Sequence, residues 1–100
     1  MSSFKEIIQS ETPVLVDFFA TWCGPCRMMT PELEQLKQEL GASIRILKVD
    51  VDNNPRVARQ FEVQGVPTLI LFRNGQILWR QSGVVKARQL AGIIRSALAG

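Results

Sequence analysis

Apolar residues follow two periodicities along the chain, and these predict an alternation of strands and helices. Short, almost continuously apolar runs at 14–19, 44–49 and 68–72 are typical of strands that are covered on both faces. Apolar residues three and four positions apart instead predict amphipathic helices. This spacing occurs twice, at Met29, Leu33, Leu36 and Leu40, and at Leu90, Ile93, Ile94, Ala97 and Leu98.

Turn-forming residues complete this pattern of elements. A short helix is expected over 4–9, and Asn54-Pro55 begins another, with Asn54 as its cap. Asn74-Gly75 predicts a hairpin turn into a further strand over 77–80. The order βαβα followed by ββα predicts the α/β class, with a single mixed sheet of four to five strands and helices on both faces.

Pro31 leaves the start of the long helix open. Thr30 and Pro31 could form the beginning of a helix, and the residues before them would then lie in a loop. Alternatively, the helix begins near Cys23 and is kinked at Pro31. Gly41 ends the helix in both cases.

The length and composition predict one globular domain over residues 1–100. The chain is 46% hydrophobic and 21% charged, which is ordinary for a soluble domain. No apolar run approaches the ~18 residues that a membrane span needs. The N-terminus also lacks the basic and apolar regions of a secretory signal. We therefore expect a cytoplasmic protein that does not bind membranes, or a mature form that is delivered elsewhere after cleavage.

Charge is distributed unevenly along the sequence. Residues 1–52 carry five basic and eight acidic side chains, whereas residues 53–100 carry seven basic and one acidic. The basic residues form no single run and do not alternate with aromatic residues, so we expect no nucleic-acid binding. They are either solvated helix faces or a surface that steers an acidic partner. Nothing in the sequence requires more than a monomer.

The two cysteines, Cys23 and Cys26, are separated by a Gly-Pro pair. Positions i and i+3 share a face of a helix, so the two sulfurs can form a disulfide or a dithiol with little backbone movement. Cys23 follows an apolar strand and precedes a helix, whose unpaired N–H groups and dipole favour a thiolate. The thiolate is the reactive form. In a reducing compartment such a pair is more often catalytic or metal-binding than structural.

Three other interpretations of the cysteine pair are weaker. A zinc site needs about four ligands, and the chain has no histidine, so we expect no metal. A purely structural disulfide over so few residues would restrain the unfolded chain least. Two inert buried thiols do not fit Gly24 and Pro25, which form a turn rather than a core segment.

Asp17 interrupts the first apolar strand and shares a face with Leu15 and Phe19. Burial there should raise the pKa of its carboxyl group. One alternative is a structural carboxylate that accepts hydrogen bonds from backbone donors. We prefer a functional role, because the strand ends only a few residues before Cys23.

The segment Trp-Cys-Gly-Pro-Cys at 22–26 follows Val-Asp-Phe-Phe-Ala at 16–20 and precedes Val-Pro-Thr at 66–68. With these motifs the chain resembles the thioredoxin family from about Phe4 to the C-terminus. The resemblance implies the thioredoxin fold, with one long kinked helix that starts near the first cysteine. Family members usually begin with a further edge strand. Only three residues precede the first expected helix here, so we do not expect that strand in full.

The resemblance also implies a thiol–disulfide oxidoreductase that reduces disulfides in other proteins by dithiol–disulfide exchange. Cys23, the more exposed thiol in the family pattern, would be the nucleophile, and Cys26 would resolve the mixed disulfide. Asp17 would accept the proton of Cys26, and Lys48 would tune Asp17 by its charge. The Gly-Pro pair lacks the histidine of the family's oxidising members, which favours reduction as the direction.

The resemblance further implies a cis peptide bond at Pro67, whose backbone edge would pair with a substrate strand beside Cys23. An apolar rim would bind the substrate, formed by Trp22, Gly24, Pro25, Val66, Pro67 and Gly83. No cofactor is implied other than the redox-active disulfide itself. The implied partners are disulfide-containing proteins and a thioredoxin reductase, linked to NADPH or to ferredoxin, which would make the chain an electron carrier in cell redox homeostasis. The alternative is a binding subunit whose rim acts irrespective of redox state.

Overall fold

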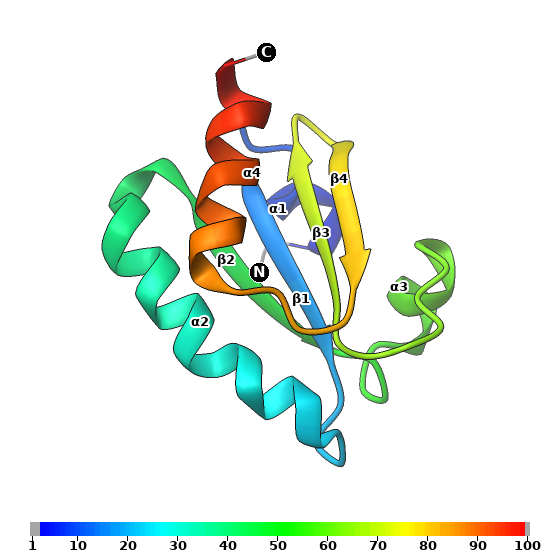
Figure 1. Cartoon of the computed structure of the whole chain (residues 1–100). Helices are drawn as coiled ribbons and strands as arrows, with labels where there is room; N and C mark the ends of the chain where they lie inside the picture. Colours follow the sequence, from blue (N-terminus) through cyan, green and yellow to red (C-terminus); the bar gives the residue numbers. More distant parts are fainter. Residues whose placement is uncertain (1–2, 100) are drawn as a thin grey trace.

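A single mixed sheet with the strand order β2-β1-β3-β4 forms the centre of the molecule (Figure 1). The computed structural model describes residues 3–99. β1 pairs in parallel with β2 and antiparallel with β3, and β3 pairs antiparallel with β4. The strands are β1 (Val14–Phe19), β2 (Arg45–Asp50), β3 (Thr68–Arg73) and β4 (Gln76–Ser82).

Helices cover both faces of this sheet, which confirms the predicted fold class. α2 and α4 pack on one face, and α1 and α3 lie on the other (Figure 1). Within the described part of the chain, none of the helices is both long and apolar enough to cross a membrane. The helices are α1 (Phe4–Ile7), α2 (Gly24–Leu40), α3 (Pro55–Gln60) and α4 (Ala87–Ala99), with a short 3-10 turn, η1, at Gly41–Ser43.

β1 is buried along almost its whole length because each of its faces contributes to a separate core. Leu15 packs into the core beneath α2 and α4, whereas Val16 and Phe18 pack into the core beneath α1 and α3. The second core contains an aromatic cluster in which the rings of Phe4 and Phe72 lie 5.9 Å apart, edge to face. Burial on both sides explains why the first strand is continuously apolar in the sequence.

α2 runs without interruption from Gly24 to Leu40 and includes Pro31. The interpretation in which the helix begins at Thr30 is therefore wrong, and the cysteines lie at a helix N-terminus rather than in a loop. Three residues on its inner face, Met29, Leu33 and Leu36, are buried against the sheet and hold the helix in place. Gly41 ends the helix with a φ of 54°, as expected for a left-handed position that favours glycine.

The observed elements differ from the predicted ones mainly at their ends. α1 stops at Ile7 instead of residue 9, and β4 extends from Gln76 to Ser82 instead of covering only 77–80. Asn54 stands at the predicted cap of α3, but its side chain donates to the carbonyl oxygen of Asp50 at 3.0 Å instead of capping the helix. Within residues 3–99 no strand precedes α1, so β2 is an edge strand of the sheet.

Candidate active site

Cys23 and Cys26 form a disulfide at the junction between β1 and α2, with their Cα atoms 5.3 Å apart. Cys23 is the N-cap residue of α2, and its Sγ accepts a hydrogen bond from the backbone amide of Cys26 at 3.1 Å. The helix N-terminus carries unpaired N–H groups and the positive end of the helix dipole. After reduction, this arrangement favours a thiolate on Cys23 over one on Cys26.

The two cysteines are almost equally buried. Cys23 is 4% exposed and Cys26 is 3% exposed, so exposure hardly separates the two residues in the disulfide form. Ala20 and Val66 pack against the pair and shield the first cysteine. The Sγ of Cys23 lies 3.7 Å from the carbonyl oxygen of Val66, a van der Waals contact because a disulfide sulfur has no proton to donate. The contact with the helix amide, rather than exposure, distinguishes the two sulfurs.

The loops before β3 and after β4 meet beside the disulfide. The Val66–Pro67 peptide bond is cis, and Pro67 is buried. The amide of Gly83 donates to the carbonyl oxygen of Pro67 at 2.8 Å. Gly83 has a φ of 96°, a conformation that residues with a Cβ rarely adopt. The structure thus brings together three of the rim residues that lie far apart in the sequence.

The remaining rim residues lie at the start of α2. Trp22 is 69% exposed, and Gly24 and Pro25 beside it are exposed as well. The indole Nε1 of Trp22 donates to Oδ2 of Asp52 at 2.8 Å. Sequence reasoning missed Asp52. The available signal was its position just after β2. Because β1 and β2 are parallel, their C-terminal ends lie at the same edge of the sheet, which brings Asp52 near Trp22.

Asp17 lies near the middle of β1 with an exposed fraction of 0%. No described residue donates a hydrogen bond to either of its carboxylate oxygens. Burial raises the pKa of this carboxyl from 3.8 to about 6, and the positive charge of Lys48 opposes part of the rise. The alternative of a structural carboxylate held by backbone donors finds no support among residues 3–99, because the oxygens have no such donors there.

Lys48 is the partner of Asp17 in the register between β2 and β1. Its side chain is exposed, and Nζ lies 4.8 Å from the centroid of the Phe19 ring. A cavity of about 250 Å³ opens here, and Lys48 lines it together with Phe19, Cys26 and Thr30. Solvent therefore reaches the neighbourhood of the second cysteine from the β2 side of the molecule, although the disulfide itself is buried.

The chemistry of the site depends on sulfur. Within residues 3–99 no three His, Cys, Asp or Glu side chains come together as a group that could hold a metal ion. Two sulfurs at a helix N-terminus can exchange between a disulfide and a dithiol.

Comparison with known proteins decides the family. The family model described as Thioredoxin matches residues 1–96. The chain belongs to the thioredoxin family. It is 49% identical over 90 residues to a thioredoxin-like protein of Synechocystis sp., a match that covers 89% of this chain and 86% of that protein. It is 46% identical over 94 residues to the bifunctional thioredoxin reductase/thioredoxin of Mycobacterium leprae, covering 94% of this chain and 20% of that protein.

Solved structures agree with this assignment. The oxidized form of mitochondrial thioredoxin 3 from Saccharomyces cerevisiae matches with a TM-score of 0.81 at 38% identity, over 90% of this chain and 84% of that one. Membership of the thioredoxin family and the Cys23–Cys26 disulfide identify the chain as a thiol–disulfide oxidoreductase that acts on proteins by dithiol–disulfide exchange. The function predicted from the motif is thereby confirmed.

Proposed function

We propose that this thioredoxin-family chain is a reductant of protein disulfides in which Cys23 attacks and Cys26 resolves. The single observation that carries the assignment of roles is the 3.1 Å hydrogen bond from the amide of Cys26 to Sγ of Cys23 at the start of α2. In the dithiol form this amide and the helix dipole stabilise negative charge on Cys23. Cys26 has no comparable donor to its sulfur among the described residues.

The reaction proceeds in two exchanges. The Cys23 thiolate attacks one sulfur of a substrate disulfide, the substrate S–S bond breaks, and the released substrate thiolate takes up a proton. Cys26 then loses its proton and attacks the Cys23 sulfur, and the second substrate thiolate leaves and is protonated. The substrate gains two electrons, and the chain ends with the Cys23–Cys26 disulfide.

Asp17 is the proposed proton acceptor for Cys26. A carboxylate with a pKa of about 6 is a stronger base than an ordinary aspartate and is still ionised at neutral pH. Its burial and the absence of hydrogen-bond donors from described residues leave both oxygens able to accept a proton. Lys48 acts on Asp17 through its charge, which keeps the pKa of the carboxyl from rising further.

The substrate binds as an extended segment across the exposed rim. The carbonyl oxygen of Val66 lies beside Sγ of Cys23, and the hydrogen bond between Gly83 and Pro67 holds the two loops together. Trp22 supplies the largest exposed apolar surface near the disulfide. Aromatic residues of this kind are common anchors in protein interfaces.

Regeneration of the dithiol requires a reductant, and we assign this role to a thioredoxin reductase. The fusion of a reductase and a thioredoxin in one Mycobacterium leprae protein supports such a pairing. NADPH-linked and ferredoxin-linked reductases both remain candidates. We further propose that the protein works as a monomer in the cytoplasm, where electron supply keeps the dithiol reduced.

The test couples NADPH oxidation to insulin reduction through a thioredoxin reductase. We expect turnover with the wild-type chain and none with Cys23→Ser. The Cys26→Ser variant should accumulate a covalent mixed disulfide on Cys23, whereas Cys23→Ser should trap almost nothing. Trapping on Cys26 would show that the roles are reversed. Full biological activity of the double Cys→Ser variant would instead support a binding subunit.

A further inference from the structure

Strand β2 has an unpaired edge. It pairs with β1 alone among the described strands. The amides of Arg45 and Val51 donate to carbonyl oxygens on the β1 side at 2.9 Å each. Each strand residue directs its N–H and C=O to the same side of the strand, and the next residue directs its own to the other side. The backbone groups of Ile46 and Lys48 therefore point away from β1.

The two ends of this edge are already closed by hydrogen bonds. Nζ of Lys37 donates to the carbonyl oxygen of Ile44 at 2.7 Å, and the carbonyl oxygen of Asp50 accepts from a later backbone amide at 2.9 Å. Within residues 3–99, the outward groups of the two residues between these ends have no hydrogen-bond partner. The edge therefore leaves two N–H and two C=O groups open to an added strand.

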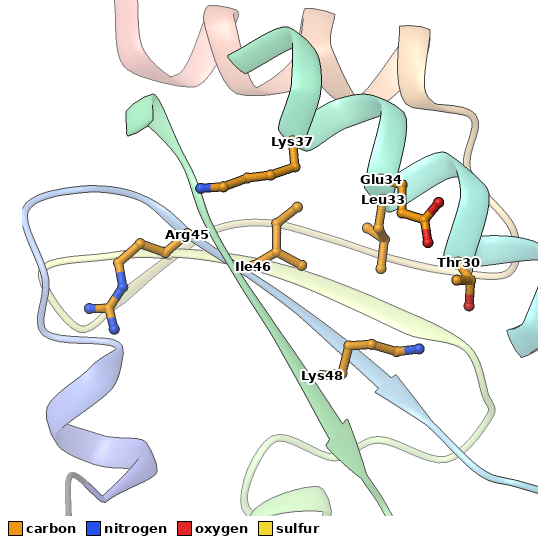
Figure 2. A pocket seen from close by; sticks show the side chains of 7 residues that line it. All are labelled: Thr30, Leu33, Glu34, Lys37, Arg45, Ile46 and Lys48. Atoms are coloured by element: carbon orange, nitrogen blue, oxygen red, sulfur yellow. The ribbon is translucent and has the colours of Figure 1, made fainter. Parts of the chain in front are cut away.

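A groove of about 490 Å³ lies alongside this edge, between β2 and α2 (Figure 2). Leu33 and Glu34 project from α2 toward the strand that carries Ile46 and Lys48 (Figure 2). Leu33 and Ile46 make part of the lining apolar. Lys48 and Lys37 supply positive charge on the α2 side of the groove, and Glu34 supplies one carboxylate. Nζ of Lys37 also donates to the carbonyl oxygens of Gly41 and Ile44. The side chain of Arg45 points away from α2 (Figure 2).

The groove continues toward the active site. Thr30 and Lys48 line both this groove and the smaller cavity that also touches Cys26. A segment bound along β2 would therefore lie close to the disulfide without covering the rim around Trp22.

We propose that the β2 edge and its groove bind an extended acidic segment of a partner protein. The segment adds to the sheet beside β2, and its main chain pairs with the outward groups of Ile46 and Lys48. Because side chains alternate between the two faces of a strand, every second residue of the segment faces α2, and these residues are acidic and lie near Lys48 and Lys37. This docking is separate from disulfide exchange, because the segment needs no cysteine.

Charge argues against a second copy of this chain as the occupant. Two β2 edges that pair with each other would bring Arg45 and Lys48 of both chains onto one short ladder. Like charges across neighbouring strands are destabilising, and lysine on an edge strand is a common safeguard against such pairing. An acidic partner converts the same charges into attraction and speeds association at low salt.

The test uses a blocked eight-residue peptide of alternating glutamate and valine, with an alternating lysine and valine peptide as its control. Amide chemical shifts of the oxidised full chain are followed during titration. We expect shifts centred on Ile46 and Lys48, slower hydrogen exchange at these two amides, and weaker binding as salt rises. The basic peptide should produce none of these effects.

Charge variants complete the design. Lys48→Glu should weaken binding of the acidic peptide roughly five-fold, and Glu34→Gln should strengthen it about two-fold. Arg56→Glu, an exposed residue on α3 across the sheet, makes the same charge change and should leave the affinity unchanged. Absence of shifts at β2, equal binding of the basic peptide, or concentration-dependent pairing of the chain through β2 would each overturn the proposal.

Discussion

The indole Nε1 of Trp22 and Oδ2 of Asp52 are joined by a 2.8 Å hydrogen bond that spans 30 positions of the sequence. Trp22 precedes the first cysteine, and Asp52 follows β2. This bond fixes the orientation of an aromatic side chain that is 69% exposed. An oriented ring loses less conformational entropy when a substrate packs on it than a freely rotating one.

Asp52→Ala should therefore raise the KM for a protein disulfide while changing kcat little. Loss of one hydrogen bond corresponds to roughly a two- to ten-fold decrease in kcat/KM. Asp52→Asn is the matched control, because it keeps a carbonyl oxygen as acceptor and should lose less. The measurement is steady-state insulin reduction. Equal losses in both variants, or none in either, would contradict a role in positioning Trp22.

Asp17→Asn should stabilise the fold at neutral pH. The native pKa of about 6 exceeds the ordinary value of 3.8, so the native state holds this proton more tightly than the unfolded state. The stability contributed by the protonated form is complete below pH 3.8 and is lost as the pH rises through about 6. Removing the charge should raise the free energy of unfolding at pH 7 by up to about 3 kcal/mol.

The difference in the free energy of unfolding is measured by urea unfolding. The wild-type chain and Asp17→Asn are compared at pH 4 and at pH 7. The gain at pH 7 should largely disappear at pH 4, where the carboxyl is protonated in the native state. The same variant should slow the resolving exchange, because an amide cannot accept the proton of Cys26. An equal loss of stability at both pH values would instead show that Asp17 is a structural group.

Two glycines offer a matched test of backbone conformation. Gly75 has a φ of 79°, and a Cβ there would lie 2.6 Å from Nε2 of Gln9. Gly92 lies inside α4, and apart from its chain neighbours and the nearby backbone of its own helix no heavy atom lies within 4 Å of its would-be Cβ. Gly75→Ala should destabilise the fold by about 1–2 kcal/mol, whereas Gly92→Ala should stabilise it by about 0.5–1 kcal/mol. Thermal unfolding of both variants checks the signs, and a stabilising Gly75→Ala would refute the described turn.

Glu32 connects α2 with the start of α4. Its Oε1 accepts from the amide of Ala87 at 2.8 Å, where a carboxylate also interacts favourably with the helix dipole. Glu32→Ala should therefore lower the free energy of unfolding by about 1 kcal/mol. Glu34→Ala, two positions along the same helix and exposed, should change it by less than about 0.5 kcal/mol. Equal effects in denaturant titrations would show that Glu32 does not cap α4.

The strands and long helices could be predicted from sequence because their burial is reflected in local apolar periodicity. Leu15 and Val16 are both buried, each in a different core, and the run around them is accordingly continuous. The start of α2 could not be decided in this way, because Pro31 is compatible with a helix start and with a helix interior. Packing of Met29 against the sheet, which depends on tertiary structure, decides in favour of the longer helix.

The cysteine pair and Asp17 were found from sequence because both break a pattern, one as a turn next to a strand and the other as a charge within an apolar run. Asp52 and Glu32 break no pattern, since acidic residues near element ends are common. Their roles depend on which loops meet in space, and this follows from the order of strands in the sheet. The burial of Cys23 likewise depends on Val66, which is 43 positions away.

Both halves of the redox centre are attached to the interior of the sheet. β1, which leads to Cys23, and β3, which follows Pro67, each have a neighbouring strand on both sides, whereas β2 and β4 have one. Interior ladders open only with large-scale unfolding, while outer strands can fray on their own. Brief separation of an outer strand would therefore leave the sulfurs and the facing proline in register until the domain unfolds as a whole.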